Sequence, residues 1–222
     1  MGIITVDKMN HLFWLGRYIE RVNTTLKAYF DVFDIMIDSD ENYYEKICSQ
    51  IGIPNIYTSK ADFITRYPYD ATDPNSIMSN LKRAYDNAIV MRDYIGTETM
   101  AYVQLAIFDL EAAKVSKESY RNLHYAIDHI FAFWGCVDDQ VDDNMVKGIL
   151  RIGKRYERID LYLCLKKPLC DILPELDRLE KRLAETHMKF NESTMYTFKN
   201  MLNDKKFNYS NARALFATLF DV

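Results

Sequence analysis

The chain has 222 residues, of which 49% are hydrophobic and 27% are charged, and its formal net charge at pH 7 is −4. A chain of this length buries enough surface to hold a core without disulfides, so we expect a single domain over residues 1–222. The acidic balance, with both signs mixed along the chain, argues against the basic surface that nucleic-acid-binding proteins present.

Local sequence patterns argue against membrane spans, disulfides, metal sites and cofactors. No stretch approaches 18 uninterrupted apolar residues and the N-terminus carries no signal pattern, so we expect no membrane partner. No Cys-x-x-Cys pair occurs among Cys48, Cys136, Cys164 and Cys170, which predicts free thiols in a reducing, bacterial-type cytoplasm. No histidine follows a glutamate by three residues, and no phosphate-binding glycine loop occurs, so we expect neither a metal nor a cofactor.

The first predicted helix begins near Asp7, whose side chain can accept hydrogen bonds from free N–H groups of the first turn, and it runs to about Asp38. Its apolar residues recur at spacings of three and four. Asn23 falls inside that apolar arc, and Glu20 lies on its flank. A helix of this length is unusual in a globular protein, so we expect it to form a central strut.

The tyrosine-rich residues 39–73 predict two short helices in an irregular connection. Gly52 is expected to end the first of these helices, and Ser59 to cap the second. We interpret the segment as a helical connection, with a lid over a site as the alternative.

The pair Asp73-Pro74 predicts the start of the next helix, because it joins a capping side chain to a proline in the first turn. Apolar residues continue at helical spacing, which places Arg92 on or beside the buried face. Gly96 and Thr97 interrupt the pattern, so we expect a break there. Thr97 is then the expected cap of a new helix, with Glu98 in its first turn.

Ser116 is the expected cap of the following helix. The acidic run at residues 138–143 (DDQVDD) resembles the magnesium-diphosphate motif of all-α isoprenoid synthases, but no second metal motif accompanies it. Acidic side chains favour helix N-termini, so we interpret the run as a helix start or a solvated loop.

Four further helices complete the prediction. The helix after the acidic run ends before Pro168, Pro174 starts a charged amphipathic helix, and residues 193–202 and 211–221 read as two short helices. With seven glycines, five prolines and long periodic segments, the chain is typical of an all-α fold.

The helix after the acidic run repeats a motif of the first helix. LGRYIERVN at residues 15–23 aligns with IGKRYERID at residues 152–160 at a constant offset of 137 residues. A glycine inside a helix costs about 1 kcal/mol against alanine, so a glycine one turn before each glutamate indicates space for a close helix or a ligand. We expect a bundle built around two related long helices, which is compatible with pseudo-symmetry. The offset pairs Gly16 with Gly153, Arg17 with Lys154, Glu20 with Glu157, Arg21 with Arg158, and Asn23 with Asp160.

The polar residues of both motifs, with three from the region around residue 92, form the candidate site. Arginine forks can clamp a carboxylate or phosphate, and a buried glutamate can hold an amine or act as a general base. The same residues can instead form a paired ionic network that fixes helix register. The residues alone leave both interpretations open. The candidate set is Arg17, Glu20, Arg21, Asn23, Arg92, Asp93, Glu98, Glu157, Arg158 and Asp160.

Three stretches of the chain carry a resemblance when they are taken together. They are HLFWLGRYIER at 11–21, DPNSI at 73–77 with NAIVMRD at 87–93, and GKRYERID at 153–160. In this order they resemble the alpha-E domain family of bacterial all-helical proteins of unknown function, whose members typically carry WLGRYLER, NPSSI and LGRxLERAD.

The chain departs from this family pattern in three ways. Lys154 stands where arginine is usual, and Met100 stands near the place of a usual aromatic residue. Family members are also longer. The resemblance therefore implies a short form that lacks part of the family's C-terminal half.

The resemblance implies a setting for the protein and no particular chemistry. Family genes often neighbour genes for an ATP-grasp protein and a transglutaminase-like protein, which implies peptide or amide-bond metabolism. We therefore expect an accessory or binding component of such a pathway, with a small-molecule or peptide ligand at a buried Glu/Arg site. The alternatives are an enzyme with Glu20 or Glu157 as general base and Arg92 as anion clamp, or a purely structural interaction module.

Overall fold

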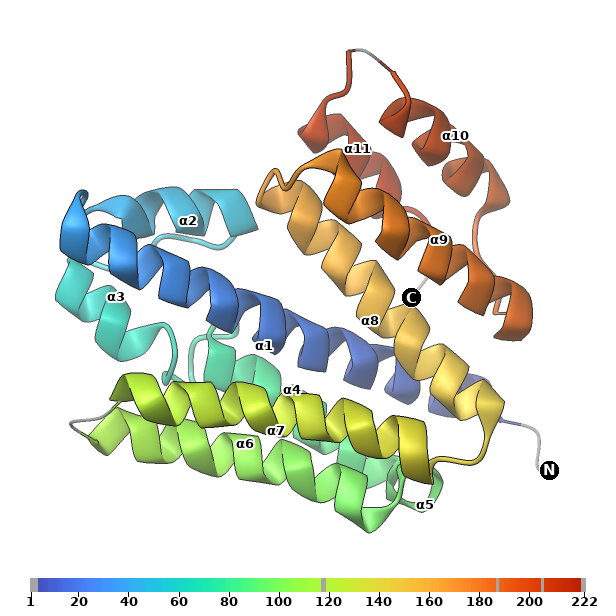
Figure 1. Ribbon diagram of the computed structural model, residues 1–222, viewed down its shortest axis with the longest axis horizontal. Helices are drawn as coiled ribbons and strands as arrows, with labels where there is room; N and C mark the ends of the chain where they lie inside the picture. Colours follow the sequence, from blue (N-terminus) through green and yellow to red (C-terminus); the bar gives the residue numbers. More distant parts are fainter. Residues whose placement is uncertain (1–3, 117–118, 187, 205, 221–222) are drawn as a thin grey trace.

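A computed structural model describes residues 4–116, 119–186, 188–204 and 206–220, and these residues form helices and no strands (Figure 1). The all-α prediction is confirmed. The helices are α1 (Val6–Asp38), α2 (Tyr43–Ile51), α3 (Lys60–Arg66), α4 (Ile77–Val90), α5 (Arg92–Ile95), α6 (Thr97–Val115), α7 (Ser119–Gln140), α8 (Asn144–Cys164), α9 (Leu169–Thr186), α10 (Glu192–Leu202) and α11 (Tyr209–Phe216).

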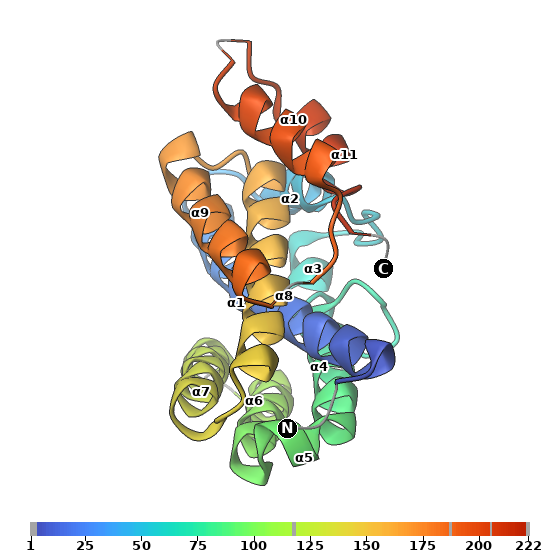
Figure 2. The same ribbon diagram turned by 90° about the vertical axis from the view of Figure 1, so that its right-hand side faces the viewer.

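Two long helices, α1 and α8, cross in the middle of the molecule and carry the two related motifs (Figures 1 and 2). The pair α6 and α7 lies on one side of α1, together with α4, and α9 to α11 lie on the other side. The predicted central strut is therefore α1, and its end at Asp38 is as expected. Its cap is Thr5 and not Asp7, because the Thr5 side chain accepts from the Lys8 N–H.

The two motif glycines allow α1 and α8 to touch through their backbones. A Cβ atom added to Gly16 would lie 2.1 Å from the carbonyl oxygen of Leu150, and one added to Gly153 would lie 2.1 Å from that of Phe13. Phe13 and Leu150 are themselves 137 residues apart, so the contact is reciprocal. The neighbouring helix, and no ligand, occupies the space that the glycines leave. Pseudo-symmetry of the whole bundle stays a prediction, since α1 packs on α4 whereas α8 packs on α9.

The tyrosine-rich segment between α1 and α4 packs as part of the core. Phe63 and Tyr67 stack with ring centroids 5.0 Å apart, and Tyr57 meets Phe63 edge to face at the same distance. Tyr29 of α1 lies against this cluster. The Ser59 cap is confirmed, because its side chain accepts from the Asp62 N–H. These buried rings fit the interpretation of the segment as a helical connection.

The break predicted at Gly96 is present, but its details differ from the prediction. Gly96 has φ +85° and separates α5 from α6, and it occupies the cap position in place of Thr97. Upstream, α4 begins after Ser76, whose side chain accepts from the Ser79 N–H. Asp73 instead accepts from the Asn75 N–H inside the preceding turn, because the chain turns there before it becomes helical.

Three later boundaries also differ. Ser116 ends α6 rather than starting α7, which is described from Ser119. Pro174 lies inside α9 rather than at its start, and it is tolerated because the carbonyl that loses its bond belongs to the first turn. The last helix ends at Phe216, short of the predicted residue 221, which lies outside the described residues.

Candidate functional site

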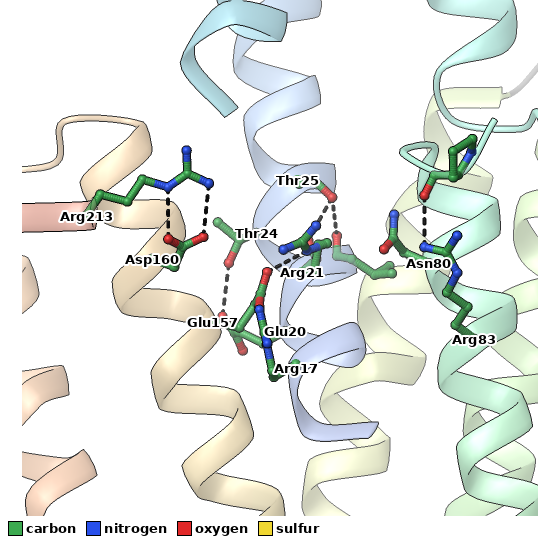
Figure 3. Close-up of polar contacts among 12 residues, drawn as sticks. Arg17, Glu20, Arg21, Thr24, Thr25, Asn80, Arg83, Glu157, Asp160 and Arg213 are labelled. Atoms are coloured by element: carbon green, nitrogen blue, oxygen red, sulfur yellow. Dashed lines mark hydrogen bonds and ion pairs between the residues drawn. The ribbon is translucent and has the colours of Figure 1, made fainter. Parts of the chain in front are cut away.

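Each motif glutamate is bound by the arginine of the other motif. Arg158 donates from Nε to Oε1 of Glu20 at 2.7 Å and from Nη2 to Oε2 at 2.9 Å. Arg21 donates from Nε to Oε1 of Glu157 at 2.5 Å. The two pairs exchange under the offset of 137 residues, as the glycine contacts do. We name Glu20, Arg21, Glu157 and Arg158 the ER clasp, and Figure 3 shows part of it between α1 and α8.

The helix period explains how two arginines of α1 bind both oxygens of Glu157. Arg17 and Arg21 lie one turn apart on one side of α1, and both reach Glu157, with Arg17 Nε at 2.8 Å from Oε2. Arg17 also lies over the rings of Trp14 and Tyr156, with its guanidinium carbon 4.3 and 4.7 Å from their centroids. The aromatic rings therefore hold this guanidinium in place as it binds the carboxylate.

Both clasp glutamates are 0% exposed, so each needs its paired charge to remain ionised. Burial alone would lower the pKa of Arg158, but the hydrogen bonds and charge of Glu20 outweigh it and raise that pKa. Glu20 also accepts from the Thr24 hydroxyl at 3.0 Å. All four carboxylate oxygens of the clasp therefore accept hydrogen bonds from the chain itself.

Two further charged residues extend the network from outer helices. Glu175 of α9 is buried and accepts from Arg155 at 2.5 Å and from Arg158 at 3.3 Å. Burial raises the pKa of Glu175, but these two arginines outweigh that effect and lower it. Arg213 of α11 donates from Nε to Oδ1 of Asp160 at 2.9 Å (Figure 3).

Sequence reasoning did not identify Glu175 or Arg213 as partners. Glu175 had a signal, since it falls on the apolar face of α9 between Ile172 and Leu179, where an unpaired acid would be costly. Arg213 had none, because a short surface helix gives no indication of which neighbour its side chain meets.

The two motifs differ at the positions of Asn23 and Asp160. Asp160 is bound by Arg213, whereas the equivalent Asn23 has no such partner. Asn23 is 4% exposed, and its Oδ1 atom accepts no hydrogen bond from the described residues. Its Nδ2 atom makes only a long contact of 3.4 Å to Oε1 of Glu20.

The motifs also differ at Arg17 and Lys154. Arg17 binds Glu157, but Lys154 forms no ion pair with Glu20 among the described residues. Its Nζ atom instead lies 3.9 Å from the centre of the Trp134 ring. Burial lowers the pKa of Lys154 to about 8, although the charge of Glu20 opposes that effect.

A cleft of about 180 Å³ opens beside the Glu20–Arg158 pair, between α1 and the end of α8. It therefore adjoins Glu20 and Asn23, which lack the counterparts of the Arg17–Glu157 and Arg213–Asp160 pairs among the described residues. The lining residues are Glu20, Asn23, Thr24, Lys27, Ala28, Asp31, Arg158, Tyr162, Leu165 and Lys167.

Three predicted site residues are not brought to the clasp. Arg92 was expected on or beside the buried face, which is wrong: its side chain is 58% exposed and pairs only loosely with Asp93, at 3.9 Å. The α4 register ends at Val90, and the single turn of α5 that follows points Arg92 outward. Glu98 is exposed and accepts from Gln140 at the end of α7. The remaining seven predicted residues do converge at the α1–α8 crossing and its edges.

The acidic run has structural roles in the described part of the chain. Asp143 caps α8 by accepting from the Met145 N–H at 2.7 Å, as the helix-start interpretation expects, and Asp138 pairs with Arg151. Residues 4–116, 119–186, 188–204 and 206–220 contain no group of three or more His, Cys, Asp or Glu side chains placed to hold a metal ion.

All four cysteines are free thiols, and Cys48 and Cys164 are buried. Burial raises the pKa of these two thiols, to about 11 and about 12. In the described segments, no helix combines the length and apolar character that crossing a membrane requires.

Comparison with known proteins gives one match. Residues 8–196 match the model of the family named Alpha-E, described as a predicted alpha-helical domain with a conserved ER motif. The chain has this dipeptide at 20–21 and 157–158, which are the four residues of the ER clasp. No curated protein and no solved structure matches the chain.

Proposed function

The chain belongs to the Alpha-E family, and we propose that it is an accessory binding domain for an enzyme of peptide or amide-bond formation. One observation carries this proposal: Glu20 and Glu157 are both fully buried, and each of their oxygens accepts a hydrogen bond from a guanidinium group of the opposite motif. A general base must direct a lone pair at its substrate, whereas these carboxylates are directed at arginines of the chain itself. The clasp therefore serves structure, and the proposed binding uses other surfaces.

The clasp has a clear structural role at the crossing. Buried ion pairs add little net stability, but they select one arrangement of the helices that carry them. Here they fix how α1 lies on α8, and α4 and α9 pack directly on these two helices. The clasp thus sets the frame on which the outer helices are displayed.

The proposed docking surface for the partner enzyme is on α6, a helix that runs along an edge of the molecule (Figure 1). Apolar residues recur there at spacings of four and three, as in one stripe of a coiled coil. Leu105, Phe108 and Val115 of this stripe are 39%, 52% and 86% exposed. An exposed apolar stripe of this kind is typical of a surface that another protein covers. We name this surface the α6 outer face, and it consists of Ala101, Leu105, Phe108, Ala112 and Val115.

Charge defines the partner segment that fits this surface. The positions flanking the α6 outer face carry Glu98 and Asp109 on one side and Glu111 on the other. Acidic flanks favour a partner with basic residues beside its apolar stripe. The proposed occupant is therefore an amphipathic helix of the partner enzyme, with apolar residues at spacings of three and four and basic flanks.

Calorimetric titration with a purified ATP-grasp enzyme, the partner class that the family resemblance implies, tests the proposal. We expect the wild type to bind. A variant with Leu105→Glu and Phe108→Glu should lose at least about tenfold in affinity, because it removes two central apolar contacts. Lys181→Glu, on the charged outer side of α9, is the matched control and should bind as the wild type does.

The same titration separates the remaining alternatives. If neither an ATP-grasp nor a transglutaminase-like enzyme binds, or if the double variant binds as tightly as the wild type, the proposal is wrong. A folded Glu20→Gln variant should still support turnover by the partner enzyme. Loss of turnover with binding intact would instead favour Glu20 as a catalytic base.

A further inference from the structure

The two sides of the α1–α8 crossing differ: the side of Glu157 and Asp160, here called the closed side, has a partner in Arg213, whereas the side of Glu20 and Asn23, the open side, faces the cleft. Asp160 of α8 accepts two hydrogen bonds from Arg213, at 2.9 and 3.4 Å. Asn23 holds the equivalent position in α1, yet its buried Oδ1 accepts nothing among the described residues. Leaving a buried acceptor without a donor has an energetic cost. An N–H donor supplied by a ligand would take the place that Arg213 takes on the other side.

The same cleft also presents cations without acidic partners. Lys27 and Lys167 line it, and neither forms an ion pair among the described residues. Lys27 is exposed, and its ammonium lies 5.0 Å from the centre of the Phe131 ring. Lysine ammonium groups readily bind carboxylates. Arg158, by contrast, is already taken by Glu20 and Glu175.

We infer that this cleft binds a small zwitterion, either a free α-amino acid or a dipeptide. Its ammonium group donates to Oδ1 of Asn23, with the exposed Asp31 carboxylate nearby on the lining. Its carboxylate binds Lys27 and Lys167. Neither a simple anion nor a simple amine would satisfy both sets of groups.

The size of the cleft supports a ligand of this class. At about 180 Å³, it lies below the range of about 300–1,000 Å³ that is typical of sites for drug-sized ligands. The site is separate from the α6 outer face, and none of its lining residues belongs to α6. The inference therefore stands whether or not a partner enzyme docks there.

Calorimetric titration of the full chain with the twenty common L-amino acids and with alanyl-alanine tests the inference. At least one of these probes should bind, and both its N-acetyl form and its methyl ester should bind at least about tenfold more weakly, since each removes one charged end. Absence of binding across the whole panel would refute the inference. Equal binding of the blocked forms, or of inorganic phosphate, would refute it as well.

The variant Asn23→Leu tests whether Asn23 binds the ligand or only stabilises the fold. Leucine is close in shape to asparagine, and the change removes an acceptor that has no partner, so the melting temperature should stay the same or rise. Binding of the amino acid should nevertheless fall at least about tenfold. A variant that keeps wild-type affinity, or one that unfolds, would overturn the assignment of Asn23.

Lysine variants test the carboxylate end. Lys27→Met and Lys167→Met should each weaken binding of the free amino acid and leave binding of its methyl ester unchanged, because the ester lacks the charged carboxylate. Lys181→Met on α9 is the matched control and should change neither. The Leu105→Glu and Phe108→Glu variant should bind amino acids as the wild type does, so failure at one site is distinguishable from failure at the other.

Discussion

The two ER motifs make the same backbone contact and the same ion pair, but one side of their crossing is closed and the other is open. On the closed side, Glu157 receives two guanidinium groups and Asp160 receives a third. On the open side, within the described part of the chain, Glu20 receives one guanidinium group and the Asn23 acceptor receives none. The reciprocal part of the clasp holds the helices together. The differing part indicates where a ligand can enter.

This comparison explains how one motif can serve both structure and binding. Two copies of a self-pairing motif need only their glycines, glutamates and arginines to lock the crossing. The neighbouring positions are then free to differ, and they do so at Lys154 and Asn23. If the motif served structure alone, both sides would be expected to carry the same ion pairs and hydrogen bonds, since each unpaired buried group has an energetic cost.

The largest expected effect comes from removing the charge of Glu157. Glu157→Gln should lower the free energy of unfolding by about 3–4 kcal/mol, because Arg17 and Arg21 would both lose their buried partner. Glu20→Gln should cost less, about 2 kcal/mol, because Arg158 keeps its bond to Glu175. Urea unfolding measures both values. Equal costs, or a reversed order, would remove the energetic distinction between the closed and open sides.

The glycines test the reciprocal part of the comparison. Gly16→Ala and Gly153→Ala should each cost about 2–3 kcal/mol, since each new methyl group would meet a carbonyl oxygen of the opposite helix. The two costs should agree closely, because the contacts are equivalent. Gly135→Ala in α7 is the control: nothing lies within 4 Å of its added Cβ, so it should gain roughly 0.5–1 kcal/mol from helix propensity. A neutral result at either motif glycine would contradict the close crossing.

Removing the donor that closes one side should have a smaller effect. Arg213→Met leaves Asp160 largely buried without its partner and should cost about 1–2 kcal/mol. The pair is partly exposed, which keeps the cost modest, since water can replace some of the lost bonds. Thermal unfolding of Arg213→Met and of Asn23→Leu measures the two effects side by side. No loss of stability is expected for Asn23→Leu. Two losses of the same size would show that the open side has a donor after all.

Much of the fold could be predicted from the sequence, because helix periodicity and capping are local. The extent of α1, the break at Gly96 and the Ser59 cap follow from neighbouring residues. The failures occur where two local signals compete. Asp73 and Ser76 both can cap α4, and the turn at Met91 redirected Arg92 away from the face that its spacing indicated.

For the candidate site, such reasoning identified the residues of the clasp but not the cleft. The offset of 137 residues identified the residues of the clasp, but spacing does not show whether facing charges bind each other or a ligand. That outcome depends on how closely the helices approach, which Gly16 and Gly153 decide in three dimensions. The cleft depends on Arg213 meeting Asp160 and on the absence of an equivalent at Asn23. Such pairings between distant helices leave no periodic signal.

The smallest expected effect is at Lys154, which takes the place of Arg17 on the open side. Lys154→Arg places a longer guanidinium there and should stabilise the protein by up to about 1 kcal/mol at pH 7, since it can reach Glu20. The advantage should depend on pH. Burial lowers the pKa of Lys154 to about 8 from 10.5, so the unfolded chain binds a proton that the folded chain releases in this window. The free energy of unfolding of the wild type should therefore rise relative to that of the variant between pH 8 and 10.5, because arginine does not titrate in this range.

Urea unfolding of both proteins at pH 7, 8, 9 and 9.5 measures this difference, and the buried tyrosines that both share cancel from it. Lys181→Arg on the surface of α9 should show no dependence on pH. A constant difference between Lys154→Arg and the wild type would mean that Lys154 keeps its proton throughout. The ammonium of Lys154 would then be solvated or paired. The open side would no longer differ from the Arg17–Glu157 side by a buried cation that lacks an ion pair.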